Sequence, residues 1–219
     1  MKIVITRTIP GNCLDLIQEK GWEVVNWDGN QPVSNDWLKK HLPGADGLIC
    51  LLSDKINGEV MDLSPGLKVI ANYAVGYDNI DITAASERGI KVTNTPDILT
   101  RATAELAFTL VLSSARKVVE GDHMTRNGQF KGWGPSLLLG MQLEGKQLGI
   151  VGAGRIGTET ARIAHGFGMK VAYWSRRKSL FIEEKLQGRR FEDLKQMLGK
   201  SDVASIHVPY SPKTHHLFN

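Results

Sequence analysis

Three glycines in the middle of the chain form its clearest chemical motif. Gly152, Gly154 and Gly157 follow the apolar run Gln147–Val151 and open a helical pattern that begins at Arg155. In this context the first glycine permits a tight turn, the second lets the backbone approach a pyrophosphate, and the third lets the helix pack on the strand. The first N–H groups and the dipole of the helix favour an anion. The motif predicts a dinucleotide-binding turn, and the alternative is a simple glycine-rich turn.

The next apolar run ends in residues that bear on the choice of dinucleotide. Ser175, Arg176 and Arg177 stand roughly 20 residues after the glycines, where an NAD-selective site usually carries an acidic residue. A carboxylate there would repel a 2′-phosphate, whereas a hydroxyl and two guanidiniums can bind one. We therefore favour NADP(H). The alternative is a solvated basic turn with NAD(H) as the cofactor.

The composition excludes several other classes of protein. With 42% hydrophobic and 23% charged residues, the 219-residue chain resembles a globular protein rather than a disordered one. A net charge of +4 with scattered basic residues argues against a nucleic-acid partner. No apolar run approaches the roughly 20 residues that span a bilayer. Cys13 and Cys50 lie far apart and form no C-x-x-C pattern, so we expect a reducing, cytoplasmic location. His215 and His216 have no third ligand at a suitable spacing, so we expect no metal site.

The elements before residue 100 predict a layered α/β domain. Short apolar runs alternate with amphipathic stretches, which is typical of parallel strands joined by helices. The strand candidates are Lys2–Ile5, Glu23–Trp27, Gly47–Leu51, Lys68–Asn72 and Lys91–Thr93. The helical candidates include Cys13–Lys20, Ser34–His41 with Ser34 as N-cap, and Ile82–Arg88. Five strands and four helices predict a flavodoxin-like sandwich.

A second series of elements follows a long helix and an arm. The pattern Ala102–Val119 is apolar on more than one face, and Gly128–Gly140 is too rich in glycine for regular helix. The later candidates are strands Gln147–Val151, Lys170–Trp174 and Val203–His207, with helices Arg155–His165 and Glu192–Leu198. We interpret these strands as the first three of a Rossmann sheet of order 3-2-1-4-5-6, which leaves Gln147–Val151 as an open edge and the domain incomplete.

Eight segments in the same order carry a resemblance to a known family. They are Leu51–Lys55, Ala74–Asp81, Asn94–Thr100, Ala102–Ala107, Gly132–Pro135, the glycine motif, Tyr173–Arg177 and His207–Thr214. In these segments the chain resembles the D-isomer-specific 2-hydroxyacid dehydrogenases, closest to the glyoxylate/hydroxypyruvate reductases. The resemblance implies a substrate domain at residues 1–99 and a dinucleotide-binding domain at residues 100–219, with an interdomain helix and arm at 100–140.

The resemblance also implies a substrate site and a dimer. The turn at Val75 and Gly76 resembles the one whose amides hold a substrate carboxylate, with Leu52 and Ser53 on the other side of the pocket. Trp133 resembles an aromatic residue of the arm that reaches toward the partner's active site in homodimers. The expected substrate is a small 2-keto or 2-hydroxy acid.

Further positions are implied for the cofactor. Thr103 resembles a residue near the nicotinamide, and Arg155 and Ile156 match the start of the helix at the pyrophosphate. The loop beneath the adenosine and ribose corresponds to Val208, Pro209 and Thr214, and His207, which precedes it, is a further cofactor-binding candidate. His207 ends a buried strand, so we expect it to satisfy local hydrogen bonds rather than to catalyse.

The family's catalytic residues have no counterpart in this sequence. Reduction of a 2-keto acid needs an arginine for the carboxylate and carbonyl, and a histidine–glutamate pair to protonate the alkoxide. We expect all three beyond Asn219, so that this chain is an inactive piece of a C-terminally longer NAD(P)-dependent oxidoreductase. Two alternatives remain: another D-2-hydroxyacid dehydrogenase, of the phosphoglycerate or D-lactate type, and a non-catalytic dinucleotide-binding or interaction protein.

Overall fold

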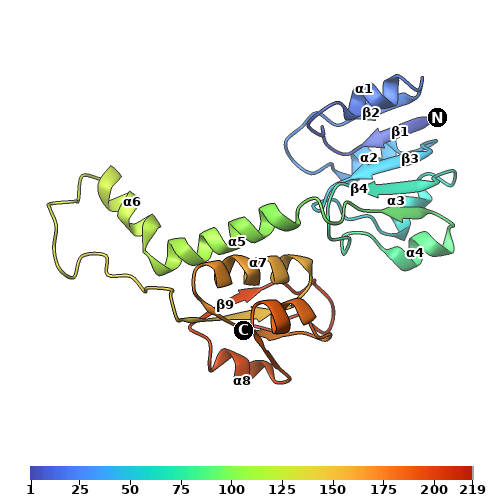
Figure 1. The fold of residues 1–219 in the computed structure, drawn as a ribbon. Coiled ribbons are helices and arrows are strands. Elements are labelled where there is room, and N and C mark those ends of the chain that lie inside the picture. The colour runs from blue at the N-terminus through green and yellow to red at the C-terminus, as the bar shows by residue number, and fades with distance from the viewer. Residues whose placement is uncertain (219) are drawn as a thin grey trace. The chain divides into compact units, whose positions relative to one another are not determined.

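The computed structural model describes residues 1–218, which form two compact units. Unit 1 contains Met1–Asp97 together with Tyr210–His215, and unit 2 contains Ile98–Pro209 and residues 216–218 (Figure 1). The domain boundary predicted from sequence follows residue 99, and the chain passes from unit 1 to unit 2 at Asp97–Ile98. No helix among residues 1–218 is both long enough and apolar enough to cross a membrane.

Unit 1 is a doubly wound parallel sheet. Its elements are β1 (Lys2–Ile5), α1 (Cys13–Gln18), β2 (Glu23–Asn26), α2 (Asn35–His41), β3 (Gly47–Cys50), α3 (Gly58–Asp62), β4 (Val69–Asn72), α4 (Ile82–Glu87) and β5 (Lys91–Thr93). The strand order is β2-β1-β3-β4-β5, and every pair is parallel. This is the flavodoxin-like order, so the predicted fold of this part is confirmed.

Strand alternation explains the two cores of unit 1. Val4, Leu48 and Ile70 belong to the buried cluster that includes side chains of α2, α3 and α4. Ile3 and Ile5 point to the opposite face and pack with α1. As predicted, the Ser34 hydroxyl caps α2, and Asn57 and Asp81 cap α3 and α4 in the same way.

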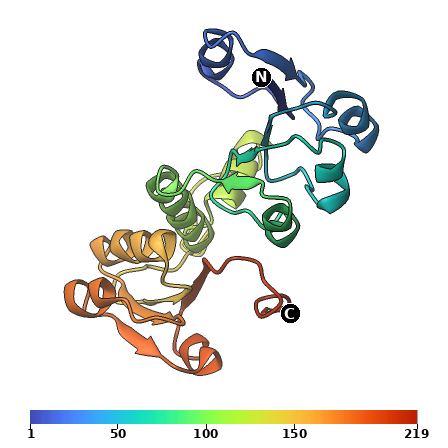
Figure 2. The same ribbon diagram turned by 90° about the vertical axis from the view of Figure 1, so that its right-hand side faces the viewer.

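Unit 2 holds the second sheet. Its elements are α5 (Thr100–Ala115), α6 (Val118–Arg126), β6 (Gln147–Val151), α7 (Arg155–Gly166), β7 (Lys170–Trp174), the π-helix η1 (Phe181–Lys185), β8 (Arg189–Phe191), α8 (Leu194–Leu198) and β9 (Val203–Ile206). The parallel strands are ordered β8-β7-β6-β9. α5 lies beside α7 on one face of this sheet, and α8 lies on the other (Figures 1 and 2).

The strand order corrects one prediction. Val203–Ile206 is the fourth strand of the Rossmann order, not the third, and it pairs with β6. β6 therefore lies between β7 and β9 and is not an open edge. In a Rossmann sheet the strand order reverses between strands 1 and 4, and both of these strands, β6 and β9, are present here. The prediction failed because it missed β8, whose three residues, two of them arginines, give no apolar pattern.

The predicted helix Ala102–Val119 is also corrected. The structure divides this region into α5 and α6, because Lys117 has a left-handed backbone with φ of 52°. α6 and the irregular segment after it project away from the sheet of unit 2 (Figure 1). The segment Gly128–Gly140 contains no helix or strand, as predicted for an arm.

Candidate substrate and dinucleotide sites

The candidate substrate residues lie on two loops of unit 1. Leu52 and Ser53 follow β3, and Val75 and Gly76 follow its parallel neighbour β4, so both loops leave the same edge of the sheet. A Cβ atom built on Gly76 would lie 3.7 Å from Cδ2 of Leu52. The structure therefore brings together the two loops that the family resemblance indicated, and their role in substrate binding stays a prediction.

The hydrogen bonds of these loops leave donors available. The carbonyl of Val75 accepts from Asn94 Nδ2 at 2.8 Å, and the carbonyl of Gly76 accepts from Asn72 Nδ2 at 2.7 Å. The amides of Val75, Gly76, Leu52 and Ser53 donate to no acceptor within residues 1–218. Neighbouring unpaired N–H groups in turns bind anions. The arrangement suits a small carboxylate.

An amide network that the sequence analysis missed fixes the geometry of both loops. Asn79 Nδ2 donates to the carbonyls of Leu51 and Asp54, each at 3.0 Å. Asn72 Nδ2 donates to Asn79 Oδ1 at 3.0 Å, which links this network to the turn at Gly76. These asparagines lie at or soon after the carboxyl end of β4, and such polar residues after strands were the only available signal.

Asp54 and Arg7 place charge beside the substrate loops. Asp54 is only 4% exposed; its Oδ2 accepts from the amide of Leu51 at 2.8 Å and from the hydroxyl of Thr6. Arg7 Nη2 donates to the Ser53 hydroxyl at 3.2 Å, and its buried Nε has no acceptor among the described residues. Arg7 thus adds a positive charge next to the loop, which favours an anionic ligand. Neither residue was predicted.

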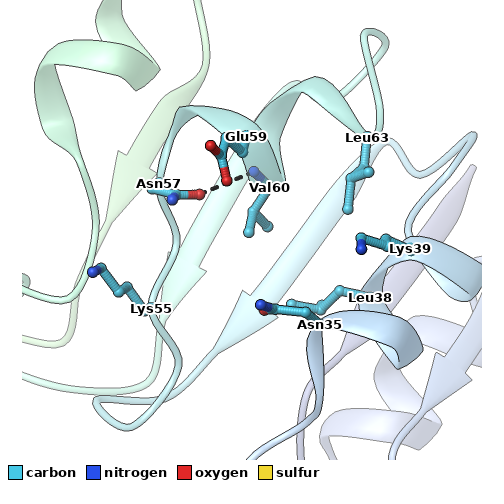
Figure 3. A pocket seen from close by; sticks show the side chains of 8 residues that line it. All are labelled: Asn35, Leu38, Lys39, Lys55, Asn57, Glu59, Val60 and Leu63. Carbon is cyan, nitrogen blue, oxygen red and sulfur yellow. Dashed lines mark hydrogen bonds between the residues drawn. The ribbon is translucent and has the colours of Figure 1, made fainter.

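A separate cavity of unit 1 lies between α2 and α3. Its volume is about 370 Å³, and its lining residues are shown in Figure 3. The side-chain oxygen Oδ1 of Asn57 there accepts from the amide of Val60, so this polar side chain serves to cap α3. None of the five predicted substrate residues lines this cavity, and we assign it no role in substrate binding.

In unit 2 the three glycines of the motif fit the roles predicted for them. A Cβ atom on Gly152, whose φ is +100°, would lie 2.9 Å from the amide nitrogen of Val208. A Cβ on Gly157 would lie 2.1 Å from the carbonyl oxygen of Gly152, whereas one on Gly154 would meet nothing within 4 Å. Two glycines therefore permit close packing, and the middle one leaves open space for a ligand.

The start of α7 completes an anion site. α7 has 12 residues, and Arg155 and Ile156 lie in its first turn. That turn holds no acidic residue, and Gly154 at the N-cap supplies no side chain to cap it. The dipole and the first amides of such a helix favour a phosphate. The residues present fit a dinucleotide diphosphate.

The loop that was predicted to select the dinucleotide lies next to this turn. The amide of Gly152 donates to the carbonyl of Trp174 at 2.8 Å, which places Ser175 beside the glycines. Arg176, Arg177 and Lys178 are exposed and form no salt bridge with any described residue. No carboxylate of the described residues therefore pairs with these positive charges.

The remaining predicted residues are placed as follows. His207 and Val208 lie against Gly152, and Pro209 follows them. His207 Nε2 is 2.8 Å from the Ser205 hydroxyl oxygen, and burial lowers the pKa of this imidazole. Thr103 is exposed on α5, and Trp133 is exposed on the arm. Thr214 lies in the segment that is grouped with unit 1, and its amide donates to the carbonyl of Ser211. Their contacts with a ligand stay predictions.

Known proteins resemble this chain over its whole length. A glyoxylate reductase of Thermococcus kodakarensis is 44% identical over 100% of this chain, which spans 66% of that relative. The TT0316 protein from Thermus thermophilus, whose crystal structure is known, is 46% identical in sequence with a TM-score of 0.92. The match covers 99% of this chain and 68% of that protein's chain. A D-lactate dehydrogenase from Aquifex aeolicus, complexed with NAD and lactic acid, is 28% identical with a TM-score of 0.82 over 100% of this chain and 64% of its own.

A family profile agrees with these relatives. The profile described as D-isomer specific 2-hydroxyacid dehydrogenase, NAD binding domain, matches residues 108–219, just over half of the chain. The matched region contains β6, α7 and β7, which carry the glycine motif and the basic loop. On this match and on the relatives above, the chain belongs to the D-isomer specific 2-hydroxyacid dehydrogenase family.

Proposed function

We propose that this chain carries the substrate-binding and dinucleotide-binding parts of an oxidoreductase that reduces glyoxylate or hydroxypyruvate to the 2-hydroxy acid. The observation that carries the proposal is the pair of loops at Leu52–Ser53 and Val75–Gly76. Their amides have no acceptor in the described part of the chain, while the Val75 and Gly76 carbonyls accept hydrogen bonds. The identity to glyoxylate reductases supports the same substrate class. A cytoplasmic location is part of the proposal, and the free thiols of Cys13 and Cys50 fit a reducing compartment.

The residues of the chain have distinct roles in this reaction. A bound nicotinamide dinucleotide supplies the hydride for the keto carbon. The amides of Val75 and Gly76 hold the substrate carboxylate and so orient the neighbouring carbonyl, which is the positioning that a bimolecular step needs. The glycine turn and the start of α7 hold the diphosphate. The arginine, glutamate and histidine that stabilise and protonate the alkoxide are proposed to lie beyond Asn219.

Substrate binding can be tested on this chain directly. Glyoxylate is titrated into the protein, and amide NMR shifts are followed in the wild type, in Gly76→Ala and in the control Gly134→Ala. The methyl group of Gly76→Ala narrows the space between the loops, so the affinity for glyoxylate should fall, while Gly134 lies on the arm and its variant should bind normally. Absence of any shift at the four amides in the wild type would contradict the substrate site.

Activity needs a second experiment. The remaining third of the Thermococcus kodakarensis relative is fused after residue 219, and glyoxylate-dependent oxidation of NADPH is followed by absorbance. We expect turnover from the fusion and none from residues 1–219 alone. Turnover by residues 1–219 alone would contradict the proposed location of the proton donor. A folded fusion that binds glyoxylate and NADPH without turnover would contradict the proposed reaction.

We also propose a preference for NADPH over NADH. The three cations of the Ser175–Lys178 loop form no salt bridge within residues 1–218, and the loop contains no carboxylate that would repel a 2′-phosphate. The probes are 2′,5′-ADP and 5′-AMP, which differ only in the 2′-phosphate. We expect tighter binding of 2′,5′-ADP, and loss of this preference in the Arg176→Ala, Arg177→Ala double variant. The control, Arg126→Ala with Lys131→Ala, removes the same charge from the region of α6 and the arm.

A homodimer is proposed from the surface of unit 2. Trp133 is 85% exposed, and large apolar side chains are also exposed on α5, α6 and the arm, namely Leu106, Leu110, Val118, Val119, Phe130 and Leu139. Exposed apolar patches of this extent mark interaction sites. Light scattering should give a dimer mass for the wild type and a monomer for Leu106→Ser, Leu110→Ser. A monomeric wild type at micromolar concentration would contradict the proposal.

A further inference from the structure

The loop that carries the unpaired cations is fixed at both of its ends. At its start, Arg190 Nη2 donates to the carbonyl of Ser175 at 3.0 Å and, more weakly, to that of Arg176 at 3.5 Å. At its end, the amide of Ser179 donates to the Tyr173 hydroxyl at 2.9 Å. Arg190 and Tyr173 lie opposite each other in the register of β8 and β7. Two adjacent side chains therefore hold one loop.

Both side chains are themselves held by carboxylates. Tyr173 is fully buried and donates its hydroxyl to Glu183 Oε1 at 2.5 Å. Burial raises the pKa of the Tyr173 phenol, and the hydrogen bond to Glu183 raises it further, so the hydroxyl stays protonated. The Arg190 side chain is 18% exposed, and its Nη1 lies 2.8 Å from Glu192 Oε1. Partly buried, charge-assisted contacts of this kind fix geometry well.

The direction of these hydrogen bonds matters for an anion. A carbonyl oxygen that faced a phosphate would repel it, and Arg190 binds the carbonyls of the loop's first two residues. The guanidiniums of Arg176 and Arg177 are left exposed and without a carboxylate partner among residues 1–218. Arg190 thus occupies the first two carbonyls of the loop, while the guanidiniums of Arg176 and Arg177 remain available to an anion.

We propose that Arg190 and Tyr173 are positioning residues that set the dinucleotide preference by holding the Ser175–Lys178 loop for a 2′-phosphate. The inference rests on the proposed NADPH preference and adds two residues that do not touch the phosphate. Without them the loop would sample other backbone conformations, and binding would have to order it again. Loss of either side chain should therefore weaken the binding of ligands that carry a 2′-phosphate and leave the binding of ligands without one unchanged.

The test compares Arg190→Gln with Arg189→Gln in the full 219-residue chain. Both variants remove one positive charge from β8, but Arg189 is exposed, stacks over Phe191 and makes no hydrogen bond to the loop among residues 1–218. Calorimetric titration should show that Arg190→Gln lowers the affinity for 2′,5′-ADP about tenfold, as expected for a lost charged hydrogen bond. The affinity for 5′-AMP should fall by less than about twofold. Arg189→Gln should bind both probes as the wild type does.

Tyr173→Phe gives an independent second variant. It removes only the hydroxyl that accepts from Ser179, and it should also lower the affinity ratio of 2′,5′-ADP to 5′-AMP. Arg190→Lys keeps the charge and should recover part of the ratio. If the wild type prefers 2′,5′-ADP but both Arg190→Gln and Tyr173→Phe keep the full ratio, the positioning role is wrong and the NADPH preference stands. If the wild type shows no preference, the NADPH proposal fails, and the positioning role fails with it.

Discussion

A Cβ atom on Gly152 would stand 2.9 Å from the amide nitrogen of Val208, so these two residues meet backbone to backbone where β6 and β9 end. The contact explains why the first glycine of the motif serves the fold as well as the ligand. Its φ of +100° adds a second reason, because side chains rarely adopt that conformation. Gly154 has neither constraint: its φ is −78°, and the space beside it is open.

The two glycines should therefore respond differently to the same substitution. Gly152→Ala is expected to lower the free energy of unfolding by about 1–3 kcal/mol, through backbone strain and overpacking. Gly154→Ala should leave that free energy within about 0.5 kcal/mol of the wild type, while weakening 5′-AMP and 2′,5′-ADP alike. Urea unfolding and calorimetric titration measure the two effects. Equal destabilisation by both variants would contradict the division of roles.

The difference between these glycines also shows how far the sequence could be interpreted. The glycine motif and most strands were predictable, because turn chemistry and apolar alternation are local signals. β8 was not, since its three residues, Arg189–Phe191, are ordered by pairing with β7 rather than by their own pattern. Missing one short strand was enough to misplace β9 in the sheet.

The substrate loops illustrate a second limit. The family resemblance indicated Leu52, Ser53, Val75 and Gly76, but not the network that holds them. Asn79 reaches the Leu51 carbonyl across 28 positions of sequence, and no local pattern encodes such a partner. Side-chain to backbone bonds of this kind become visible only when the parallel strands set the two loops beside each other.

Removing the Asn79 side chain should loosen unit 1. Asn79→Ala leaves the carbonyls of Leu51 and Asp54 without their donor, and a lost buried hydrogen bond typically lowers stability by about 1–3 kcal/mol. The exposed Asn30, whose side chain makes no hydrogen bond within residues 1–218, provides the control Asn30→Ala. Hydrogen exchange should quicken around both loops in the first variant only. Unchanged exchange there would show that the loops hold their conformation without Asn79.

The two cysteines should differ in reactivity. Cys50 is fully buried, and burial, with a smaller contribution from the Asp54 carboxylate, raises the pKa of its thiol to about 12. A thiol that is both protonated and enclosed reacts slowly with iodoacetamide, because the thiolate is the nucleophile. Cys13 is only half-buried. Mass spectrometry at pH 8 should find one label in the folded chain, on Cys13, and two in urea; early labelling of Cys50 would contradict the enclosed core.

His207 should make the stability of unit 2 depend on pH. Burial holds the pKa of its imidazole below the ordinary value of 6.5, so the unfolded state takes up a proton at a higher pH than the folded state does. The contribution of His207 to the free energy of unfolding is therefore complete above about pH 6.5. It is lost as the pH falls from there through the pKa of the folded state, by at most about 1.4 kcal/mol per pH unit. Urea unfolding at pH 7.5 and pH 5.5 should show a smaller loss in His207→Gln than in the wild type. The exposed His123 supplies the control His123→Gln, which should follow the wild type, and an identical loss in all three proteins would mean that His207 is protonated as readily in the fold as outside it.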